Sequence, residues 1–309
     1  MGKKRVFLTG GSGFLGSRVK LHLESLGAAV VAPTREALDL RDLEACSKWL
    51  ERADPDVVIH LAAVVGGIGA NRLEPGRFFY QNTLIGLNMI EAARRAGTRK
   101  FVQVGTVCSY PKHTETPFRE ETIWDGYPEE TNAPYGIAKK SLLTMLQAYR
   151  AQYGLNGIYL IPVNLYGPGD NIDPATSHVV PALIRKFLEA KRSGADTVHV
   201  WGTGQASREF LYVDDAVCGI ARAAEHYNDP EPVNLGSGSE ISISALVDMI
   251  ASKVGFTGMI RFDHTRPDGQ PRRQLDISKA QKLFGWTAAT PLEHGLEVAI
   301  EDVRARLSS

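Results

Sequence analysis

The stretch Arg5-Val-Phe-Leu-Thr-Gly-Gly-Ser-Gly-Phe-Leu-Gly16 joins a short apolar run to a glycine-rich turn. Its first five residues predict a buried strand, and the apolar spacing over Ser17–Leu26 predicts a helix after the turn. A second apolar run, Ala29–Ala32, predicts the next strand. Spaced glycines between a strand and a helix allow a tight bend and let a pyrophosphate approach the helix N-terminus. The stretch therefore predicts a dinucleotide-binding βαβ unit.

The residues after the second strand bear on which dinucleotide is bound. NAD sites usually place an acidic residue there for the ribose diol. This chain instead has Arg35, which can bind the 2′-phosphate of NADP(H), with Thr34 beside it. Glu36 and Asp39 lie nearby and leave NAD(H) open as an alternative. We favour NADP(H), with Asp39 and Leu40 flanking the adenine ring.

An alternation of strands and helices continues along the chain. Apolar runs predict buried strands at Val57–Ala63, Phe101–Gly105 and Gly157–Val163, and a long helix at Asn82–Gly97. Repeated βα units predict an α/β fold with a Rossmann-type, doubly wound parallel sheet.

The pattern loosens beyond about residue 167. We expect residues 1–166 to form the NADP-binding Rossmann domain, with a later segment near 211–236 packing back on it. Residues 167–309 are expected to form mainly a smaller C-terminal substrate-binding lobe that closes over the cofactor.

A tyrosine and a lysine are spaced by four residues in Tyr135-Gly-Ile-Ala-Lys139. On a helix the two side chains share one face. A cation beside a phenol favours the phenolate and lowers its pKa, so the pair predicts a proton donor or acceptor for carbonyl chemistry. Thr106 and Cys108 follow the strand Phe101–Gly105, at the position where an open α/β sheet binds its ligands.

Composition excludes several classes of function. The 309 residues carry a formal net charge of zero, which gives no general affinity for nucleic acid or for an anionic membrane. No apolar run reaches the length of a membrane span. Three widely spaced cysteines, Cys46, Cys108 and Cys218, form no metal-ligand pattern and suit a reducing compartment. We expect a cytoplasmic enzyme with no metal site, nucleic-acid partner or membrane partner.

The glycine turn, the hydroxyl of Thr106 and the Tyr135–Lys139 motif, in this order, resemble the extended short-chain dehydrogenase/reductase superfamily. Longer stretches are similar to the GDP-L-fucose synthase family, the 3,5-epimerase-4-reductases of GDP-4-keto-6-deoxy-mannose. These stretches are Ala63–Ile68, Tyr80–Asn82, Cys108–Pro111, Asn164–Pro168, Ser177–Leu183, Arg208–Leu211, Pro267–Gly269 and Gly285-Trp286.

The resemblance implies a role for each residue of the expected catalytic centre. Cys108 matches the family base and His178 the family acid of two epimerisations beside a 4-keto group. Tyr135 would hydrogen-bond the C4 oxygen and later protonate it as hydride arrives. Lys139 would hold the nicotinamide ribose and depress the pKa of Tyr135. The family's usual residue at position 106 is serine, and Thr106 keeps that hydroxyl while adding a methyl group.

Further positions are expected to contact the ligands. The expected cofactor contacts are Gly10, Ser12, Gly13, Phe14, Leu15, Gly16, Arg35, Asp39, Leu40, Leu61, Ala62, Ala63, Val104, Gly105, Lys139, Pro162, Asn164, Leu165 and His178. The expected substrate contacts are Asn164, Lys186, Trp201 and Arg208. Ser12 occupies the position where some relatives carry an arginine, so more of the phosphate binding falls to Arg35.

Other functions stay open on the same residues. One is an epimerase or reductase for a related nucleotide-sugar, such as a GDP-mannose 3,5-epimerase or a GDP-deoxyheptose reductase. Another is a sensor that binds the nucleotide without turnover, which the intact Thr106, Tyr135 and Lys139 disfavour. The resemblance also implies a homodimer formed through the helices at Asn82–Gly97 and Tyr135–Gln152.

Overall fold

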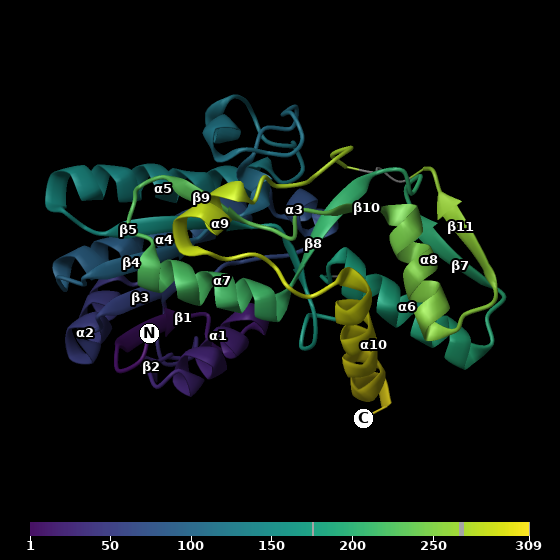
Figure 1. Cartoon of the computed structure of the whole chain (residues 1–309), viewed down its shortest axis with the longest axis horizontal. Coiled ribbons are helices and arrows are strands. Elements are labelled where there is room, and N and C mark those ends of the chain that lie inside the picture. The colour runs from purple at the N-terminus through teal and green to yellow at the C-terminus, as the bar shows by residue number, and fades with distance from the viewer. Residues whose placement is uncertain (175, 266–268, 309) are drawn as a thin grey trace.

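The computed structural model describes residues 1–174, 176–265 and 269–308 (Figure 1). Its largest layer is a six-stranded sheet in the order β2-β1-β3-β4-β5-β9, in which every neighbouring pair is parallel. The strands are β1 (Arg5–Thr9), β2 (Ala29–Val31), β3 (Val57–His60), β4 (Lys100–Val104), β5 (Gly157–Pro162) and β9 (Pro232–Leu235). This sheet confirms the predicted Rossmann-type fold.

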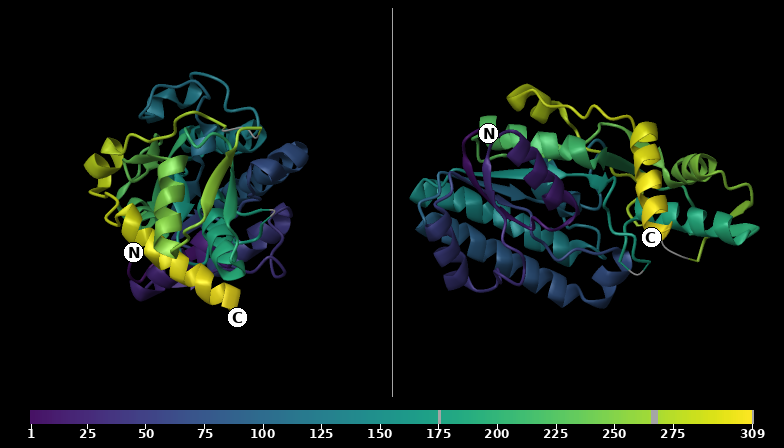
Figure 2. Two further views of the ribbon diagram at one scale, coloured as in Figure 1. Left: turned by 90° about the vertical axis from the view of Figure 1, so that its right-hand side faces the viewer. Right: turned by 90° about the horizontal axis from the view of Figure 1, so that it is seen from below.

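Helices cover both faces of this sheet (Figure 2). On one face α1 contacts α7, and on the other α4 contacts both α2 and α5. Their bounds are α1 (Phe14–Ser25), α2 (Leu43–Ala53), α4 (Pro75–Arg95), α5 (Ala133–Tyr153) and α7 (Val213–His226). Local sequence explains the ends of these helices. The Asp42 side chain accepts a hydrogen bond from the Ala45 backbone N–H at 3.0 Å and so caps α2, while Gly154 ends α5 with a φ of 72°.

A second group of elements forms the other end of the molecule. It contains a three-stranded sheet, β10-β8-β6, and a two-stranded sheet, β11-β7. The strands are β6 (Asn164–Tyr166), β7 (Thr197–Trp201), β8 (Ser207–Tyr212), β10 (Glu240–Ser242) and β11 (Met259–Asp263), and the helices are α6 (Val179–Ser193), α8 (Ile243–Val254) and α10 (Leu292–Ser308). Short elements complete the fold: α3 (Ile68–Leu73), α9 (Ser278–Phe284) and the 3₁₀ turns η1 (Val107–Ser109) and η2 (Glu120–Trp124).

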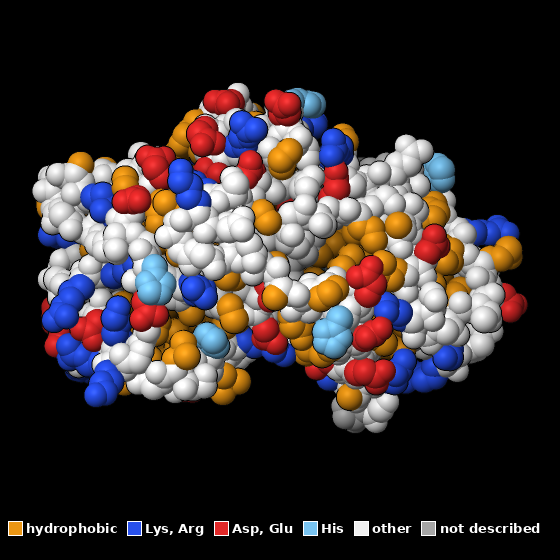
Figure 3. Space-filling view, viewed as in Figure 1, with side chains coloured by type: hydrophobic (Ala, Val, Ile, Leu, Met, Phe, Trp, Pro, Cys, Tyr) orange, Lys and Arg blue, Asp and Glu red, His pale blue; other side chains and the backbone are white. Residues whose placement is uncertain are grey.

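Two separate hydrophobic clusters underlie these two groups. The first contains the main sheet and also Ile220 of α7, although α7 follows the first strands of the second group in sequence. The second is built on residues such as Phe187 of α6 and Leu246 of α8. The space-filling view shows a hollow between the two ends of the molecule, with apolar side chains inside it (Figure 3). The division of the chain at residue 166 stays a prediction.

Several elements differ from the sequence-based expectations. The helix expected at Asn82–Gly97 begins earlier, at Pro75, because proline is tolerated in the first helical turn. Neither α2 nor β9 was predicted, and β9 completes the main sheet. Pro267 and Asp268 lie outside the described residues. In the part of the chain that the structure describes, no helix is long and apolar enough to cross a membrane.

Candidate active site

The glycine turn is held in a conformation that only small residues fit. Gly10 has a φ of 75°, and a Cβ there would lie 2.9 Å from the Ala62 backbone nitrogen. A Cβ on Gly16 would overlap the Gly10 carbonyl oxygen. Ser12 and Gly13 are exposed, and Gly13 is the N-cap residue of α1. The N-terminus of α1 is therefore open to a pyrophosphate, which the glycines let approach the backbone, and this part of the chain fits a dinucleotide.

The residues after β2 separate into an exposed cation and a paired acid. Arg35 and Thr34 are exposed. Asp39 accepts hydrogen bonds from the Arg41 guanidinium and backbone N–H, which lower the pKa of Asp39 to about 2. Because that carboxylate is engaged by Arg41, Arg35 is the group beside the turn that remains available for a phosphate. Leu40 is half-buried, and its carbonyl accepts a hydrogen bond from Asn88.

The strands that follow present small residues beside the turn. Leu61, Ala62 and Ala63 are half-buried at the end of β3. A Cβ on Gly105 would overlap the Tyr159 ring, so a larger residue would not fit where β4 ends. Val104 and Pro162 are buried, whereas Asn164 and Leu165 are half-buried. Phe14 and Leu15, in the first turn of α1, are half-buried as well.

Helix α5 packs directly on the turn η1, which follows β4. A Cβ on Gly136 would overlap the Cys108 carbonyl oxygen, and Ser109 Oγ donates to the Gly136 carbonyl at 3.0 Å. This close approach places Tyr135 against the residues of η1. Thr106 forms a side-chain hydrogen bond with Tyr135, and its Oγ1 also accepts from the Cys108 backbone N–H at 3.2 Å. The structure therefore brings together three residues that the sequence had placed on two separate segments.

Burial dominates the ionisation of the tyrosine and the lysine. It raises the pKa of Tyr135, which also lies near Cys108, whereas the hydrogen bond with Thr106 acts in the opposite direction. Burial lowers the pKa of Lys139 to about 8. The expectation that Lys139 lowers the pKa of Tyr135 is therefore wrong for this structure, because desolvation outweighs any attraction between the two groups. Tyr135 is a neutral phenol at pH 7.

Cys108 is half-buried and faces a cation from a distant part of the chain. The Arg273 guanidinium lies 3.9 Å from Cys108 Sγ. The other two cysteines lie elsewhere, with Cys46 buried on α2 and Cys218 exposed on α7. Sequence reasoning missed Arg273, and the only local signal was its place a few residues after the Pro267–Gly269 stretch.

The residues expected at the second end of the molecule are more dispersed. His178 is exposed at the N-terminus of α6, near the carboxyl group of Asp170. Lys186 donates to the His199 carbonyl at 2.7 Å, and burial lowers its pKa. Trp201 is 65% exposed at the end of β7. No hydrogen bond, ion pair or ring contact among the described residues joins these three to Tyr135.

Arg208 is half-buried on β8, and its guanidinium donates to the Ser207 carbonyl at 2.7 Å. Its neighbour Glu209 is fully buried and accepts from the backbone N–H groups of Gly238 and Leu275, at 2.7 and 2.6 Å. Glu209 therefore joins β8 to two loops through their backbone.

A buried histidine lies behind the site. His60, at the end of β3, shares a 2.7 Å hydrogen bond with Thr9 of β1, and its other ring nitrogen has no partner among the described residues. Burial, with a further contribution from the nearby Lys139 ammonium, holds the pKa of His60 well below its usual range. The pairing of His60 with Thr9 across two strands has no local signal in the sequence.

Comparisons with known proteins agree with the dinucleotide-binding fold that the geometry indicates. Residues 6–236 match the NAD dependent epimerase/dehydratase family. A GDP-L-fucose synthase from Sinorhizobium fredii is 42% identical over 298 residues, which cover 96% of this chain and 95% of that protein.

Two solved structures are similar over almost the whole chain. A GDP-L-fucose synthetase from Naegleria fowleri bound to NADP has a TM-score of 0.91 at 27% identity, covering all of this chain and 96% of that one. A GDP-6-OMe-4-keto-L-xylo-heptose reductase from C. jejuni has a TM-score of 0.92 at 28% identity, covering 98% of each chain. The chain belongs to the NAD dependent epimerase/dehydratase family, and its relatives within that family include GDP-L-fucose synthases.

Proposed function

We propose that this protein is an NADPH-dependent enzyme that converts GDP-4-keto-6-deoxy-D-mannose to GDP-L-fucose by 3,5-epimerisation and 4-reduction. The observation that carries the proposal is the meeting of Thr106, Cys108 and Tyr135 at the end of β4, where α5 packs on η1. One site thus holds a thiol that can remove a proton from carbon and two hydroxyls that can donate hydrogen bonds to a carbonyl oxygen. The name of the S. fredii relative supports the choice of substrate and product.

The cofactor we assign is NADP(H), which supplies the hydride that reduces C4. The open N-terminus of α1 and the glycines of the preceding turn would hold its pyrophosphate. Arg35 would bind the 2′-phosphate, since Asp39 is already paired with Arg41. Lys139 would bind the nicotinamide ribose. The NADP-bound relative from N. fowleri supports this choice over NAD(H).

Each epimerisation is a proton exchange at a carbon next to the C4 carbonyl. The Cys108 sulfur, as thiolate, takes the proton from C3 or C5, so that a C–H bond breaks, an S–H bond forms and the electron pair moves to the C4 oxygen. Tyr135 and Thr106 donate hydrogen bonds to that oxygen as it gains charge. His178 then gives a proton to the opposite face of the carbon. The neutral phenol of Tyr135 suits this donor role.

The reduction uses the same oxygen. Tyr135 transfers its proton to the C4 oxygen when hydride reaches C4, and the resulting phenolate is reprotonated from solvent. The raised pKa of Tyr135 makes its phenolate a strong base in the buried site, so protonation returns it to the donor form at neutral pH.

The substrate lobe is assigned to residues 167–309. Lys186 and Arg208 would bind the diphosphate of the GDP-sugar, and Trp201 would offer an aromatic surface. Asn164 lies on β6, between this lobe and the main sheet, and donates to the Glu209 carbonyl at 2.8 Å. Trp201 is 65% exposed, so part of its side chain faces solvent.

A second candidate is reduction of a related GDP-linked keto-heptose. It is favoured by the similarity to the C. jejuni reductase, whose fold superposes with a TM-score of 0.92. A panel of GDP-4-keto sugars, assayed by the loss of NADPH absorbance, separates the two candidates by their kcat/KM ratios.

The deciding experiment runs the reaction in heavy water. The protein, GDP-4-keto-6-deoxy-D-mannose and NADPH should yield GDP-L-fucose with deuterium at C3 and C5, together with oxidation of NADPH. Cys108→Ser should lose the deuterium at both carbons and still bind NADPH. Cys218→Ser, at an exposed cysteine on α7, is the matched control and should behave as the wild type. Normal deuterium incorporation by Cys108→Ser would remove Cys108 from its role as base.

We also propose a homodimer formed by α4 and α5. These helices pack on each other and leave apolar side chains exposed, including Tyr80 at 63%, Leu87 at 38% and Tyr153 at 48%. Light scattering should give twice the chain mass for the wild type, and Leu87→Glu should shift it towards the monomer. A cytoplasmic location fits three cysteines that are all free.

A further inference from the structure

Arg273 is a buried cation with no carboxylate partner among the described residues. The residue is 8% exposed. Among the described residues, its guanidinium has two polar contacts: Gln270 Oε1, 3.3 Å from Nε, and Cys108 Sγ, 3.9 Å from a terminal nitrogen. A guanidinium keeps its charge at every working pH, and buried charges in proteins are normally paired. Of the groups in the described part of the chain that contact Arg273, only the sulfur of Cys108 can become an anion.

The backbone holds Arg273 in this position from several sides. Its carbonyl accepts from the Glu209 N–H at 3.0 Å, and the next carbonyl, of Gln274, accepts from Phe118 at 2.7 Å. Gln270, which orients the guanidinium, donates to the carbonyls of Pro111 and Lys112 at 3.3 and 3.0 Å. The segment is thus tied both to β8 and to the loop that follows η1, which fixes the guanidinium beside Cys108.

We propose that Arg273 is a positioning residue that holds Cys108 in its thiolate form, ready to act as the base of the epimerisation. This inference rests on the proposed function for the role of Cys108, although the charge pair itself can be measured without substrate. The guanidinium favours the thiolate by direct attraction across 3.9 Å.

The other ionisable groups near Cys108 do not replace this cation. Tyr135 faces Cys108 from α5 and is a neutral phenol at pH 7. Lys139 lies one helical turn further along α5, and its charge is lost as pH rises through its pKa of about 8, whereas a guanidinium keeps its charge. Thr106 bonds the Cys108 backbone nitrogen and has no charge. Within the described part of the chain, Arg273 is therefore the permanent positive charge in contact with the sulfur.

The pair also explains how the base can work at neutral pH. Thiolate takes a proton from C3 or C5 and becomes a neutral thiol, while the negative charge moves to the C4 oxygen. An active site that begins with the charge on sulfur needs no second base to remove the thiol proton first. After each proton abstraction the thiol proton passes to solvent and the Arg273–Cys108 pair forms again, so the thiolate is restored for the second carbon.

The test measures the reactivity of Cys108 in the full chain across pH. The rate of its alkylation by iodoacetamide, followed by peptide mass spectrometry, reports the thiolate. Arg273→Gln should move the midpoint of the pH profile upward by about one unit or more, so that alkylation at pH 7 slows about 10-fold. Arg273→Lys, which keeps the charge, should restore most of the rate. Alkylation of Cys218 in the same samples is the internal control and should not change.

If a folded Arg273→Gln protein keeps the wild-type pH profile of Cys108 alkylation, the proposal is overturned. If that variant also loses turnover while its alkylation profile is unchanged, Arg273 instead binds the substrate. Should Arg273→Gln not fold, the ultraviolet thiolate band of the wild type minus that of Cys108→Ser decides at pH 7: its presence supports the charge pair, and its absence ends it. A shifted profile with no deuterium exchange in the wild type would leave the charge pair standing while the proposed epimerase function fails.

Discussion

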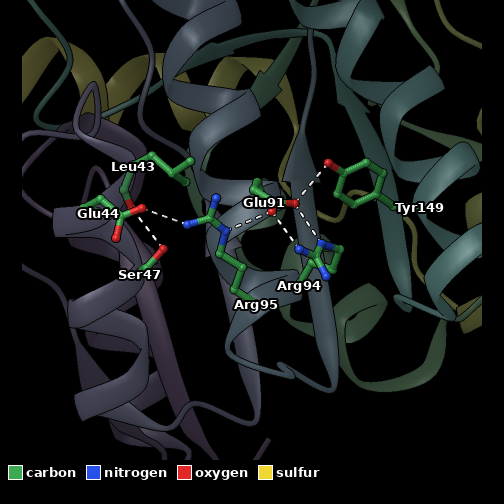
Figure 4. Close-up of polar contacts among 7 residues, drawn as sticks. All are labelled: Leu43, Glu44, Ser47, Glu91, Arg94, Arg95 and Tyr149. Carbon is green, nitrogen blue, oxygen red and sulfur yellow. Dashed lines mark hydrogen bonds and ion pairs between the residues drawn. The ribbon is translucent and has the colours of Figure 1, made fainter.

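The surroundings favour the neutral forms of ionisable side chains at one end of helix α5 and the charged forms at the other. At its N-terminal end, Tyr135 is half-buried beside η1 and Lys139 is buried. At its C-terminal end, Tyr149 donates to Glu91 of α4 at 3.0 Å, and Glu91 also binds the guanidinium groups of Arg94 and Arg95 (Figure 4). Arg95 in turn reaches Glu44 of α2 at 2.8 Å, so this cluster joins three helices.

The difference between the two ends lies in partners rather than in residue type. Around Glu91 the hydrogen bonds from Arg94 lower the pKa of the carboxyl to about 2, and Glu91 raises the pKa of Arg94. Both groups stay charged. Around Tyr135 and Lys139 desolvation dominates and favours the neutral forms. One helix therefore carries fixed charges at one end and groups suited to proton exchange at the other.

The largest effect is expected from Tyr135→Phe. Removing the phenol hydroxyl takes away both the hydrogen bond to the C4 oxygen and the proton for reduction, so NADPH oxidation should slow by about 10²–10⁴-fold. Tyr149→Phe is the matched control on the same helix, and its turnover should stay near the wild-type value. Steady-state rates, with thermal unfolding to check the fold, measure both. Equal losses in the two variants would show that the ends of α5 do not differ in function.

Lys139→Met is expected to raise the stability of the fold at neutral pH. The pKa of Lys139 is about 8 in the folded chain and 10.5 in the absence of burial. Between these values the unfolded chain holds more protons, so the folding free energy of the wild type improves as pH rises through this window. Below pH 8 the folded wild type bears the full cost of burying the charged ammonium. The variant, which lacks this charge, should therefore be more stable than the wild type by up to ~3 kcal/mol at pH 7.

Urea unfolding of Lys139→Met and wild type should show this difference vanishing near pH 10.5. Lys100 is the matched control because burial also lowers its pKa to about 8, yet its ammonium donates to the carbonyls of Ala223 and Tyr227. Lys100→Met should destabilise the fold, since it removes the ammonium that donates to these buried carbonyls. A Lys139→Met protein that is less stable than the wild type at pH 7 would contradict the desolvation argument.

The smallest effect is expected from Glu91→Gln in the charged cluster. Because Glu91 is partly exposed, its loss should reduce stability by only ~1 kcal/mol at pH 7. The pKa of this carboxyl is depressed, so its contribution is present above pH 4.5 and is lost as pH falls towards 2. Urea midpoints of variant and wild type should therefore converge in acid. A gap that stays constant between pH 7 and pH 3 would show that the charge of Glu91 is not what stabilises this end.

Much of the fold could be predicted from the sequence because βα alternation is a local pattern. The strands at 5–9 and 157–163 and the helix that carries Tyr135 follow from apolar spacing alone. Strand β9 could not be predicted, since its four residues join the sheet beside β5 across a long detour of the chain. The meeting of Cys108 with Arg273 spans 165 residues and has no periodic signal.

The candidate site, like the fold, could be predicted from the sequence only in part. Its glycines, Thr106 and the Tyr135–Lys139 spacing could be read in order along the chain. The direction of the Tyr135 pKa could not, because it depends on how completely Phe78, Thr106 and their neighbours exclude water from the phenol. The spacing correctly placed Lys139 on the same helical face as Tyr135, but burial set the direction of both pKa shifts.

The late return of the chain to the main sheet has a consequence for synthesis. Strand β5 is fully buried in the finished molecule, and its outer edge is covered by β9. On the ribosome, a chain that has emerged only as far as α6 has made β5 but not β9. It therefore presents an apolar strand edge of the kind that pairs with other chains. Sheet completion waits for residues 232–235, so chaperone contact during translation should concentrate on this interval.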